Sequence, residues 1–537
     1  MFRILRNTKR SVLKRKIGVV HLVLDGKIPF FKEDKSYIEK KVLPPPPLSL
    51  FELSQNLQRL SRDRSVRALI IDIGQPEFGG FADFHELRSI IEHFKRSGKP
   101  VWMVFHHINF SDYYLATIAD KVFMVATGLF NVIGMSSTVN FYKDFLKQYG
   151  LEAQVLQVTP FKSAGNFLVY DEMPEEQKEM MNWLFDSMYS TIISAISADR
   201  DKSLEEVQTM IDTCPMTEKV ALEKGWIDGV ISSGIEELIA NEFGKVRVTD
   251  YFKAVKSLSI PRVRKRIAVI RAEGAIVDGK SSNMPLPIPI FGGKKMGDIT
   301  IVQSIRHVIR NKKKFQAALF FVDSGGGSAV ASETILQEMR KLSKQLPVFT
   351  YFHNVAGSGG YYIACFGRPI YSTPLTITGS IGVINMKFIN KGFYDKQKIK
   401  QYNFNRGENA DIQSSQRPWN EKEYEQLKEM IMNIYETFVD HVASSRELDA
   451  KYVDTIGGGR VWTGEQGLEK KIVDNLKSFS TTLDDLEFEF DGITPVVIPT
   501  KVRRVVPPLI DKVALWNELR DMTKFPLLLP YLDIALF

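Results

Sequence analysis

Short apolar runs alternate with longer amphipathic stretches along most of the chain. In the second half, the runs AALFFVDS, PVFTYF and RPIYSTP have the length and the β-branched and aromatic content of strands. The stretches ASETILQEMRKLSKQ and EKEYEQLKEMIMNIYETFVDHVASSR have helical periodicity. Strands that alternate with helices form parallel βαβ units, so the pattern predicts an α/β fold.

The same pattern occurs twice, as a divergent internal repeat. The segment KIGVVHLVLDG at 16–26 has a counterpart in RIAVIRAEGAIVDG at 266–279, and KPVWMVFHH has one in LPVFTYFHN. Tyr113 and Tyr361 stand 248 residues apart, and the other matched pairs keep nearly the same offset. A steady offset indicates repeated structural units. We therefore expect two tandem domains.

The repeat divides the chain into four segments. We expect a basic arm over 1–15, a first repeat over 16–255, a second repeat over 264–500 and an apolar tail over 501–537. A length of 537 residues suits two domains with sizeable cores. The composition, with 44% hydrophobic and 25% charged residues, is that of an ordinary globular protein.

Charge and cysteine content exclude some classes of function. The chain has 71 Lys and Arg residues against 63 Asp and Glu residues, a net charge of +8. This excess is too small to indicate a nucleic-acid partner, and the basic clusters lack interleaved aromatic residues. Cys214 and Cys365 cannot form a disulfide framework and do not have the spacing of metal ligands. We expect neither a nucleic acid nor a metal.

The two ends of the chain bear on membrane contact. The basic start MFRILRNTKRSVLKRK runs into an apolar stretch about half as long as the ~20 residues that span a bilayer, and no signal-peptide cleavage site follows. The end, FPLLLPYLDIALF, is also short and contains two prolines. We expect no transmembrane segment. A basic arm on anionic lipid and a solvated arm both stay open. Each half has a long proline-rich loop after its first strand, which favours contact with a partner, a membrane or a hydrophobic substrate.

Two glycine-rich turns of the second half are the candidate chemical features. One is SGGGSAVASE, which contains Gly326, and the other is AGSGGYYIA, in which Ser358 precedes Gly359. Glycines bring bare N–H groups close to a ligand, and helix N-termini favour negative charge. If the turns face each other, the N–H groups of Gly326 and Gly359 would form an oxyanion hole. Plain βα turns or a phosphate cradle are the alternatives, although neither turn has a P-loop or dinucleotide fingerprint.

As a nucleophile, Ser358 requires a base. His441 is the only histidine after it in the sequence, and it falls in a predicted helix without an accompanying acidic motif. The pentapeptide AGSGG also lacks the leading glycine of the G-x-S-x-G elbow. A Ser-His-Asp triad is therefore poorly supported.

Together, SGGGSAVASE, AGSGGYYIA, TITGSIGVI and RVWTGEQG resemble the signal peptide peptidase A (protease IV) family. The resemblance is to its long bacterial form, and it covers about residues 16–500. It implies two tandem crotonase/Clp-protease-like domains and a serine endopeptidase of the Ser–Lys dyad type. In the turn VDSGGG, Gly325 stands where the family often has proline. The amino-terminal membrane anchor common in the long form is absent.

The resemblance also implies the base. The first-half motif VTPFKSAGNF supplies Lys162, whereas the matching stretch of the second half has no lysine. Ser380 in TGSIG resembles the serine that orients this lysine. Phe110 occupies the place of Ser358 in the first half, so each repeat keeps one member of the dyad. Burial lowers the pKa of a lysine, which lets Lys162 accept the Ser358 proton before an acyl-enzyme forms. No metal or cofactor is required.

By resemblance, the substrates are hydrophobic peptides such as cleaved signal peptides, and the chain forms a homotetramer. The expected location is the inner (cytoplasmic) membrane, with peripheral attachment, or the soluble cytoplasm. A crotonase-like acyl-CoA enzyme and a catalytically inactive assembly scaffold are the alternative functions. The sequence leaves open whether the dyad forms within one chain or between subunits.

Overall fold

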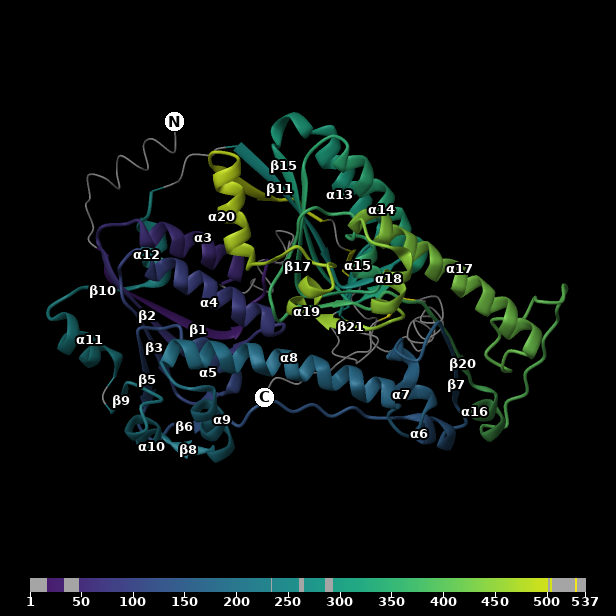
Figure 1. Cartoon of the computed structure of the whole chain (residues 1–537), viewed down its shortest axis with the longest axis horizontal. Coiled ribbons are helices and arrows are strands. Elements are labelled where there is room, and N and C mark those ends of the chain that lie inside the picture. Colours follow the sequence, from purple (N-terminus) through teal and green to yellow (C-terminus); the bar gives the residue numbers. More distant parts are fainter. Residues whose placement is uncertain are drawn as a thin grey trace.

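The computed structural model describes residues 17–32, 48–232, 234–259, 265–284, 293–500, 503–504 and 527–528. Each half of the chain builds its own central sheet with helices around it (Figure 1). The expected basic arm lies outside the described residues, and so does most of the expected apolar tail. Parts of both proline-rich loops, 33–47 and 285–292, lie outside them as well.

The sheet of the first half has six strands, each parallel to its neighbours. In spatial order they are β10 (Val248–Asp250), β1 (Gly18–Lys27), β2 (Val66–Glu77), β3 (Val101–Phe105), β5 (Lys121–Val125) and β9 (Gly229–Ile231). A small second layer joins β4 (Ile108–Asn109), β6 (Leu129–Asn131) and β8 (Met216–Thr217).

The sheet of the second half repeats this order around its own central strands. Its main path is β23 (Ile493–Val497), β11 (Lys265–Glu273), β15 (Ala317–Ser324), β17 (Val348–Gly357), β19 (Ile377–Gly379) and β21 (Val461–Thr463). The strands β18 (Ile370–Ser372) and β22 (Asn475–Leu476) extend β17 on the side. All these pairs are parallel except β19 with β21. The prediction of an α/β fold with tandem parallel units is confirmed.

A third group of short strands lies beside the second sheet. It contains β12 (Ala275–Val277), β13 (Ser282–Met284), β14 (Gly293–Gly297), β16 (Gly326–Gly327), β24 (Arg503–Arg504) and β25 (Leu527–Leu528).

Amphipathic helices cover the sheets. Those of the first half are α3 (Leu50–Ser61), α4 (Phe81–Lys95), α5 (Phe110–Ala116), α6 (Lys143–Gln148), α7 (Asn166–Val169), α8 (Glu175–Arg200), α9 (Leu204–Thr213), α10 (Glu218–Glu223), α11 (Ile235–Phe243) and α12 (Tyr251–Ser257). Those of the second half are α13 (Asp298–Arg310), α14 (Ala329–Ser343), α15 (Gly359–Tyr362), α16 (Lys391–Lys396), α17 (Glu421–Arg446), α18 (Ala450–Ile456), α19 (Gly464–Glu469) and α20 (Phe479–Glu489).

Helix α13 shows why these stretches pack. Its Ile301, Ile305 and Val308 follow helical spacing and are all buried, so they form one apolar stripe. Strand β15 is buried along almost its whole length, which fits a strand covered on both faces. Even the longest helices of the described chain, α8 and α17, lack an apolar stretch that could cross a bilayer.

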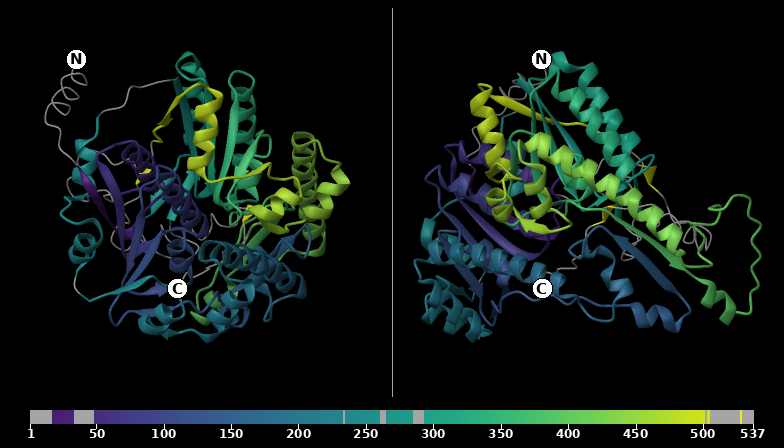
Figure 2. Two further views of the ribbon diagram at one scale, coloured as in Figure 1. Left: turned by 60° about the vertical axis from the view of Figure 1, so that its left-hand side comes forward. Right: turned by 45° about the vertical axis from the view of Figure 1, so that its right-hand side comes forward.

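The two halves interlock through helices α8 and α20 and through a ribbon of two strands (Figure 2). Helix α8 of the first half runs beneath the second, where Trp183 Nε1–H donates to the Val461 carbonyl at 2.8 Å. Helix α20 of the second half packs on α4 of the first. Strand β7 (Glu152–Gln157) pairs antiparallel with β20 (Ile384–Ile389), so that one strand from each half forms a two-stranded ribbon.

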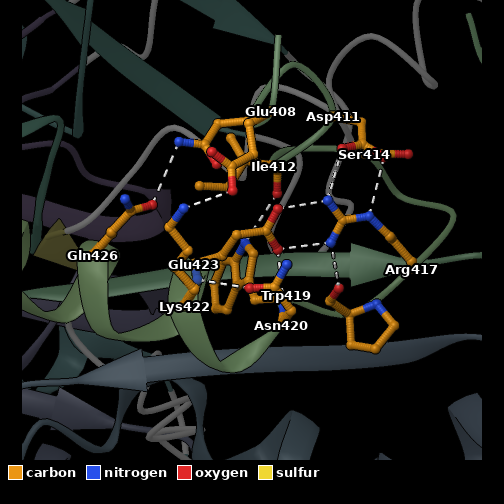
Figure 3. Close-up of polar contacts among 12 residues, drawn as sticks. Glu408, Asp411, Ile412, Ser414, Arg417, Trp419, Asn420, Lys422, Glu423 and Gln426 are labelled. Atoms are coloured by element: carbon orange, nitrogen blue, oxygen red, sulfur yellow. Dashed lines mark hydrogen bonds and ion pairs between the residues drawn. The ribbon is translucent and has the colours of Figure 1, made fainter. Parts of the chain in front are cut away.

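This ribbon belongs to an arm that projects from the body in the right-hand view of Figure 2; we use "the arm" for β7, β20, α6, α16 and the loop 397–420. Figure 3 shows how Arg417 fixes the end of that loop, with its guanidinium 2.7 Å from Asp411 and 2.5 Å from Glu423. The Trp419 N–H then donates to Gln154 of β7 at 2.7 Å. The loop is therefore tied to both halves.

Candidate active site

Ser358 lies at a sharp turn between strand β17 and helix α15. Its φ of 53° and ψ of −122° place a non-glycine residue in a conformation that side chains rarely adopt. The Ser358 N–H donates to the Gly379 carbonyl at 2.8 Å, and its own carbonyl accepts from the Tyr362 N–H at 2.9 Å. These two bonds hold the strained residue, and its side chain is fully buried.

Lys162 reaches Ser358 from the other half of the chain. It stands in the first half, just before a single 3-10 turn at Ser163–Gly165. Its Nζ lies 2.8 Å from Ser358 Oγ, 2.9 Å from Ser380 Oγ and 3.1 Å from the Ser380 carbonyl. The structure therefore brings these three residues together, and it does so within one chain.

The environment of Lys162 favours a neutral amine. The side chain has no exposed surface, and this burial lowers the pKa of Lys162 to about 7. A neutral amine can accept the Ser358 hydroxyl proton while it donates to the Ser380 carbonyl. Such a pair has the geometry and protonation state of a nucleophile with its base.

Ser380, like Ser358, is a strained residue that a backbone hydrogen bond holds in place. Its φ is 52°, another strained value for a side-chain-bearing residue, and its N–H donates to the Arg460 carbonyl at 2.6 Å. Its side chain is buried beside the amine of Lys162. This position allows the hydroxyl to orient the amine toward Ser358.

The two predicted glycine turns meet. A Cβ placed on Gly359 would lie 3.2 Å from both the Gly326 Cα and the Gly327 nitrogen. Gly326 has a φ of 104°, which favours glycine. Its N–H donates to Ser324 Oγ at 3.2 Å, while Gly359 begins α15, where a helix leaves its first N–H groups without partners in its own turn.

Strand β16, formed by Gly326 and Gly327, also pairs with other strands of the chain. It pairs in parallel with Ile276 of β12 and antiparallel with Leu527 and Leu528 of β25. This glycine edge next to Ser358 therefore holds an extended peptide segment.

A third glycine-rich turn contacts Lys162 directly, and the sequence reasoning missed it. Gly459 has a φ of 91°, and a Cβ there would lie 2.5 Å from the Lys162 Cα. Thr159 donates its hydroxyl hydrogen to the Gly458 carbonyl of the same turn. The run TIGGGR in the sequence was the available signal, because three successive glycines mark close backbone approach.

The residues considered as alternatives lie elsewhere or have other partners. His441 Nε2 lies 3.1 Å from Glu333 of α14, and its Nδ1 contacts Arg340. Phe110 is buried and stacks on Tyr189, so the first repeat has an aromatic ring where the second has a hydroxyl. Cys365 is buried.

Comparison with known proteins decides the family. The family model described as Peptidase family S49 matches residues 93–241 and 340–491, one segment in each half. The chain belongs to peptidase family S49. The chain is therefore a serine peptidase. The two matched segments, one in each half, agree with the tandem repeat.

Curated relatives of this S49 chain cover most of its length. It is 30% identical to "Serine protease SPPA, chloroplastic" of Arabidopsis thaliana over 81% of this chain and 65% of that protein. It is 27% identical to "Protease 4" of Haemophilus influenzae over 82% of this chain and 73% of that protein. It is 27% identical to "Protease 4" of Salmonella typhi over 89% of this chain and 83% of that protein.

Proposed function

We propose that the chain is a serine endopeptidase in which Ser358 is the nucleophile and Lys162 the general base. The observation that carries the proposal is the 2.8 Å approach of the buried Lys162 amine to Ser358 Oγ. Membership of family S49 supports the same reaction class.

The proposed reaction has two halves. Ser358 Oγ attacks the carbonyl carbon of the scissile peptide while its proton moves to the neutral Lys162 amine. The resulting ammonium gives this proton to the leaving nitrogen as the C–N bond breaks, which leaves an ester on Ser358. Lys162 then takes a proton from water as the water oxygen attacks the ester. That proton returns to Ser358 Oγ when the acid departs.

Negative charge develops on the carbonyl oxygen in both halves of the reaction. We assign its stabilisation to the N–H groups of Gly326 and Gly359, which come from adjoining turns. Because the Gly326 N–H already donates to Ser324 Oγ at 3.2 Å, substrate must exchange that long bond for a bond to the oxyanion.

The shape of the site favours an extended peptide. The glycine edge β16 pairs antiparallel with β25 of the same chain, and a substrate strand would replace β25 on this edge. Hydrophobic peptides, such as cleaved signal peptides, are the proposed substrates because of the resemblance to the signal peptide peptidase A family.

The proposal includes a homo-oligomer, a tetramer by the same resemblance, with peripheral membrane contact. Exposed aromatic side chains on the arm support a contact surface there: Phe404 is 90% exposed and Tyr402 is 81% exposed.

Separate substitutions of the dyad test the function. Ser358→Ala and Lys162→Ala are each expected to lower kcat on a hydrophobic peptide ester by about 10³-fold or more, because neither member acts without the other. A fluorophosphonate probe should label the unaltered protein at Ser358. Ser111→Ala is the matched control, since Ser111 is a buried serine next to Phe110, the first-repeat counterpart of Ser358.

Each rival function has its own outcome. If either dyad variant keeps full activity, the Ser–Lys assignment is wrong. Turnover of an acyl-CoA thioester by both variants would instead favour the crotonase-like enzyme. A folded protein that no fluorophosphonate labels and that cleaves no peptide would favour the inactive scaffold.

A further inference from the structure

Strand β17 contains a bulge just before the turn that holds Ser358. In the pairing of β15 with β17, Val322 is opposite Phe352 but Ser324 is opposite Ala356. Asp323 alone therefore faces three residues, His353–Val355. A bulge of this kind bends a strand and changes the direction of the residues that follow it. The direction of Gly357 and Ser358 thus depends on how the bulge is held.

The bulge is held from its own half by Asp323. The Asp323 Oδ1 accepts the Val355 N–H at 3.1 Å. Asp323 is followed in the chain by Ser324 and the glycine turn with Gly326. One carboxylate therefore links the strand that leads to the nucleophile with the turn that supplies the proposed oxyanion N–H.

The bulge is held from the other half by Asp83 of helix α4. The Asp83 Oδ1 lies 2.8 Å from His353 Nε2, and its Oδ2 accepts from Asn354 Nδ2 at 3.0 Å. The same Oδ2 accepts the Gly79 N–H at 2.8 Å, so both carboxylate oxygens are engaged. Asp83 is 3% exposed and His353 is not exposed, which makes these bonds strong and directional.

The start of α4 fits against the bulge without spare room. A Cβ on Gly80 would lie 2.5 Å from Asn354 Oδ1, so a larger residue there would displace the Asn354 side chain. In the first repeat, the segment FGGFAD takes the place that the glycine turn has in the second. The first-repeat copy of that turn therefore packs on the strand that leads to Ser358.

The surroundings of His353 favour its charged form. Burial alone would lower its pKa, but Asp83 and Glu86 of α4 and Asp323 of β15 face it, and the net effect raises the pKa of His353. Tyr351 is its neighbour on β17, and the rings of Phe30 and Phe321 pack 4.4 and 5.2 Å from the imidazole. The contact between the halves thus includes a buried hydrogen bond between the His353 imidazole and the Asp83 carboxyl group.

We propose that Asp83 is a positioning residue for Ser358, acting across the repeat interface through the bulge His353–Val355. The inference rests on the proposed function, because it concerns the reactivity of that serine. The first repeat then supplies two separate parts of one centre: Lys162 as the base, and Asp83 as the support of the nucleophile's strand.

The rate of fluorophosphonate labelling, measured on the full chain, tests this role. Asp83→Asn is nearly isosteric but loses the negative charge and one acceptor. We expect its second-order labelling rate at Ser358 to fall by about 10–100-fold, since displacements near 1 Å have effects of this size. The final labelled fraction of folded protein should stay near that of the unaltered chain. kcat on a peptide ester should fall in proportion, with KM little changed.

Two further variants make the result decisive. Asn354→Ala removes only one donor to Asp83, so it should slow labelling by a smaller factor even if Asp83→Asn does not fold. His107→Ala is its matched control, because His107 aligns with Asn354 in the repeat and is exposed in the first half. The control should label at the unaltered rate.

The outcomes separate this inference from the proposed function. If the unaltered chain is not labelled at Ser358, the proposed function fails. If it is labelled, and the folded variants react at its rate with only a smaller labelled fraction, Asp83 is merely structural and the inference is overturned. Equal rates and equal fractions would overturn it as well.

Discussion

At the scale of single residues, the site depends on a lysine buried among uncharged partners. The three oxygens around the Lys162 amine belong to Ser358 and Ser380, and none is a carboxylate. Hydroxyl and carbonyl oxygens satisfy a neutral amine, but they do not replace the hydration that an ammonium loses on burial. The same burial that makes Lys162 a base therefore disfavours its charged form.

The pH dependence of peptidase activity follows from this. Below its pKa of about 7, Lys162 is protonated and cannot accept the Ser358 proton. kcat/KM on a peptide ester should therefore rise with pH and level off above about 8, roughly one unit beyond that pKa. Steady-state rates measured from pH 5.5 to 9 at constant ionic strength give this rising part of the pH profile and its midpoint.

A histidine base would give a similar rise of activity with pH, because an unperturbed imidazole titrates near ~6.5. His441→Gln distinguishes the two cases: with Lys162 as the base, the rise should keep its midpoint in this variant. A flat profile, a rise that disappears in His441→Gln, or activity that falls as pH rises through 7 would contradict a lysine base.

The sequence predicted which residues meet at the candidate site better than it predicted which residues surround and hold them. Ser358 and Lys162 stand in recognisable local motifs, and the structure brings them together. The contacts of Gly459 and Asp83 join segments hundreds of residues apart, and such packing leaves no local pattern. Their small or charged side chains are also typical of ordinary turns and helix starts.

At the scale of elements, two pieces of the second half set the place of Lys162. The ribbon of β7 and β20 fixes the first-half segment beside the second half. The glycine turn at 457–459 then packs on the backbone of Lys162, where Gly459 leaves no room for a side chain. The position of the amine is therefore a property of the turn as well as of the lysine.

Gly459→Ala tests the turn. Its new methyl group would overlap the Lys162 backbone, with contacts of 2.5–2.6 Å, so Lys162 must move. We expect kcat to fall by about 100-fold or more, the size of loss typical of misplacement near 1 Å. The measurement is kcat on a peptide ester, with the melting temperature recorded to show that the variant is folded.

Gly407→Ala is the matched control for backbone strain. Gly407 also has a positive φ, 97° against 91° for Gly459, but nothing lies within 4 Å of its would-be Cβ. It should lose some stability and keep its kcat. Equal losses of kcat in the two variants would mean that strain, and not displacement of Lys162, is responsible.

Element types were predicted well where the local pattern is strong. The periodic stretch EKEYEQLKEMIMNIYETFVDHVASSR is helix α17, Glu421–Arg446, and AALFFVDS is strand β15. The antiparallel ribbon of β7 and β20 was not predicted. Its strands come from different halves, and their pairing depends on how the halves dock.

At the scale of the whole molecule, the repeat places two different parts of one centre in two copies of one fold. Each half has its own sheet, yet α8, α20 and the ribbon of β7 and β20 cross between them. The Lys162–Ser358 contact lies inside this interlocked unit. A tetramer would therefore contain four complete centres under the proposed function, and no centre would borrow a residue from a neighbour.

Mixed oligomers test that arrangement. Ser358→Ala and Lys162→Ala chains, each with its own affinity tag, are produced together and purified through both tags, so that every recovered particle contains both. If the dyad forms within one chain, each chain lacks one member and the mixture should be as inactive on a peptide ester as either variant alone. Unaltered chains purified together with Ser358→Ala chains show that the procedure preserves activity. Activity in the doubly tagged mixture would mean that Lys162 of one chain serves Ser358 of another, in contradiction to the 2.8 Å contact inside this chain.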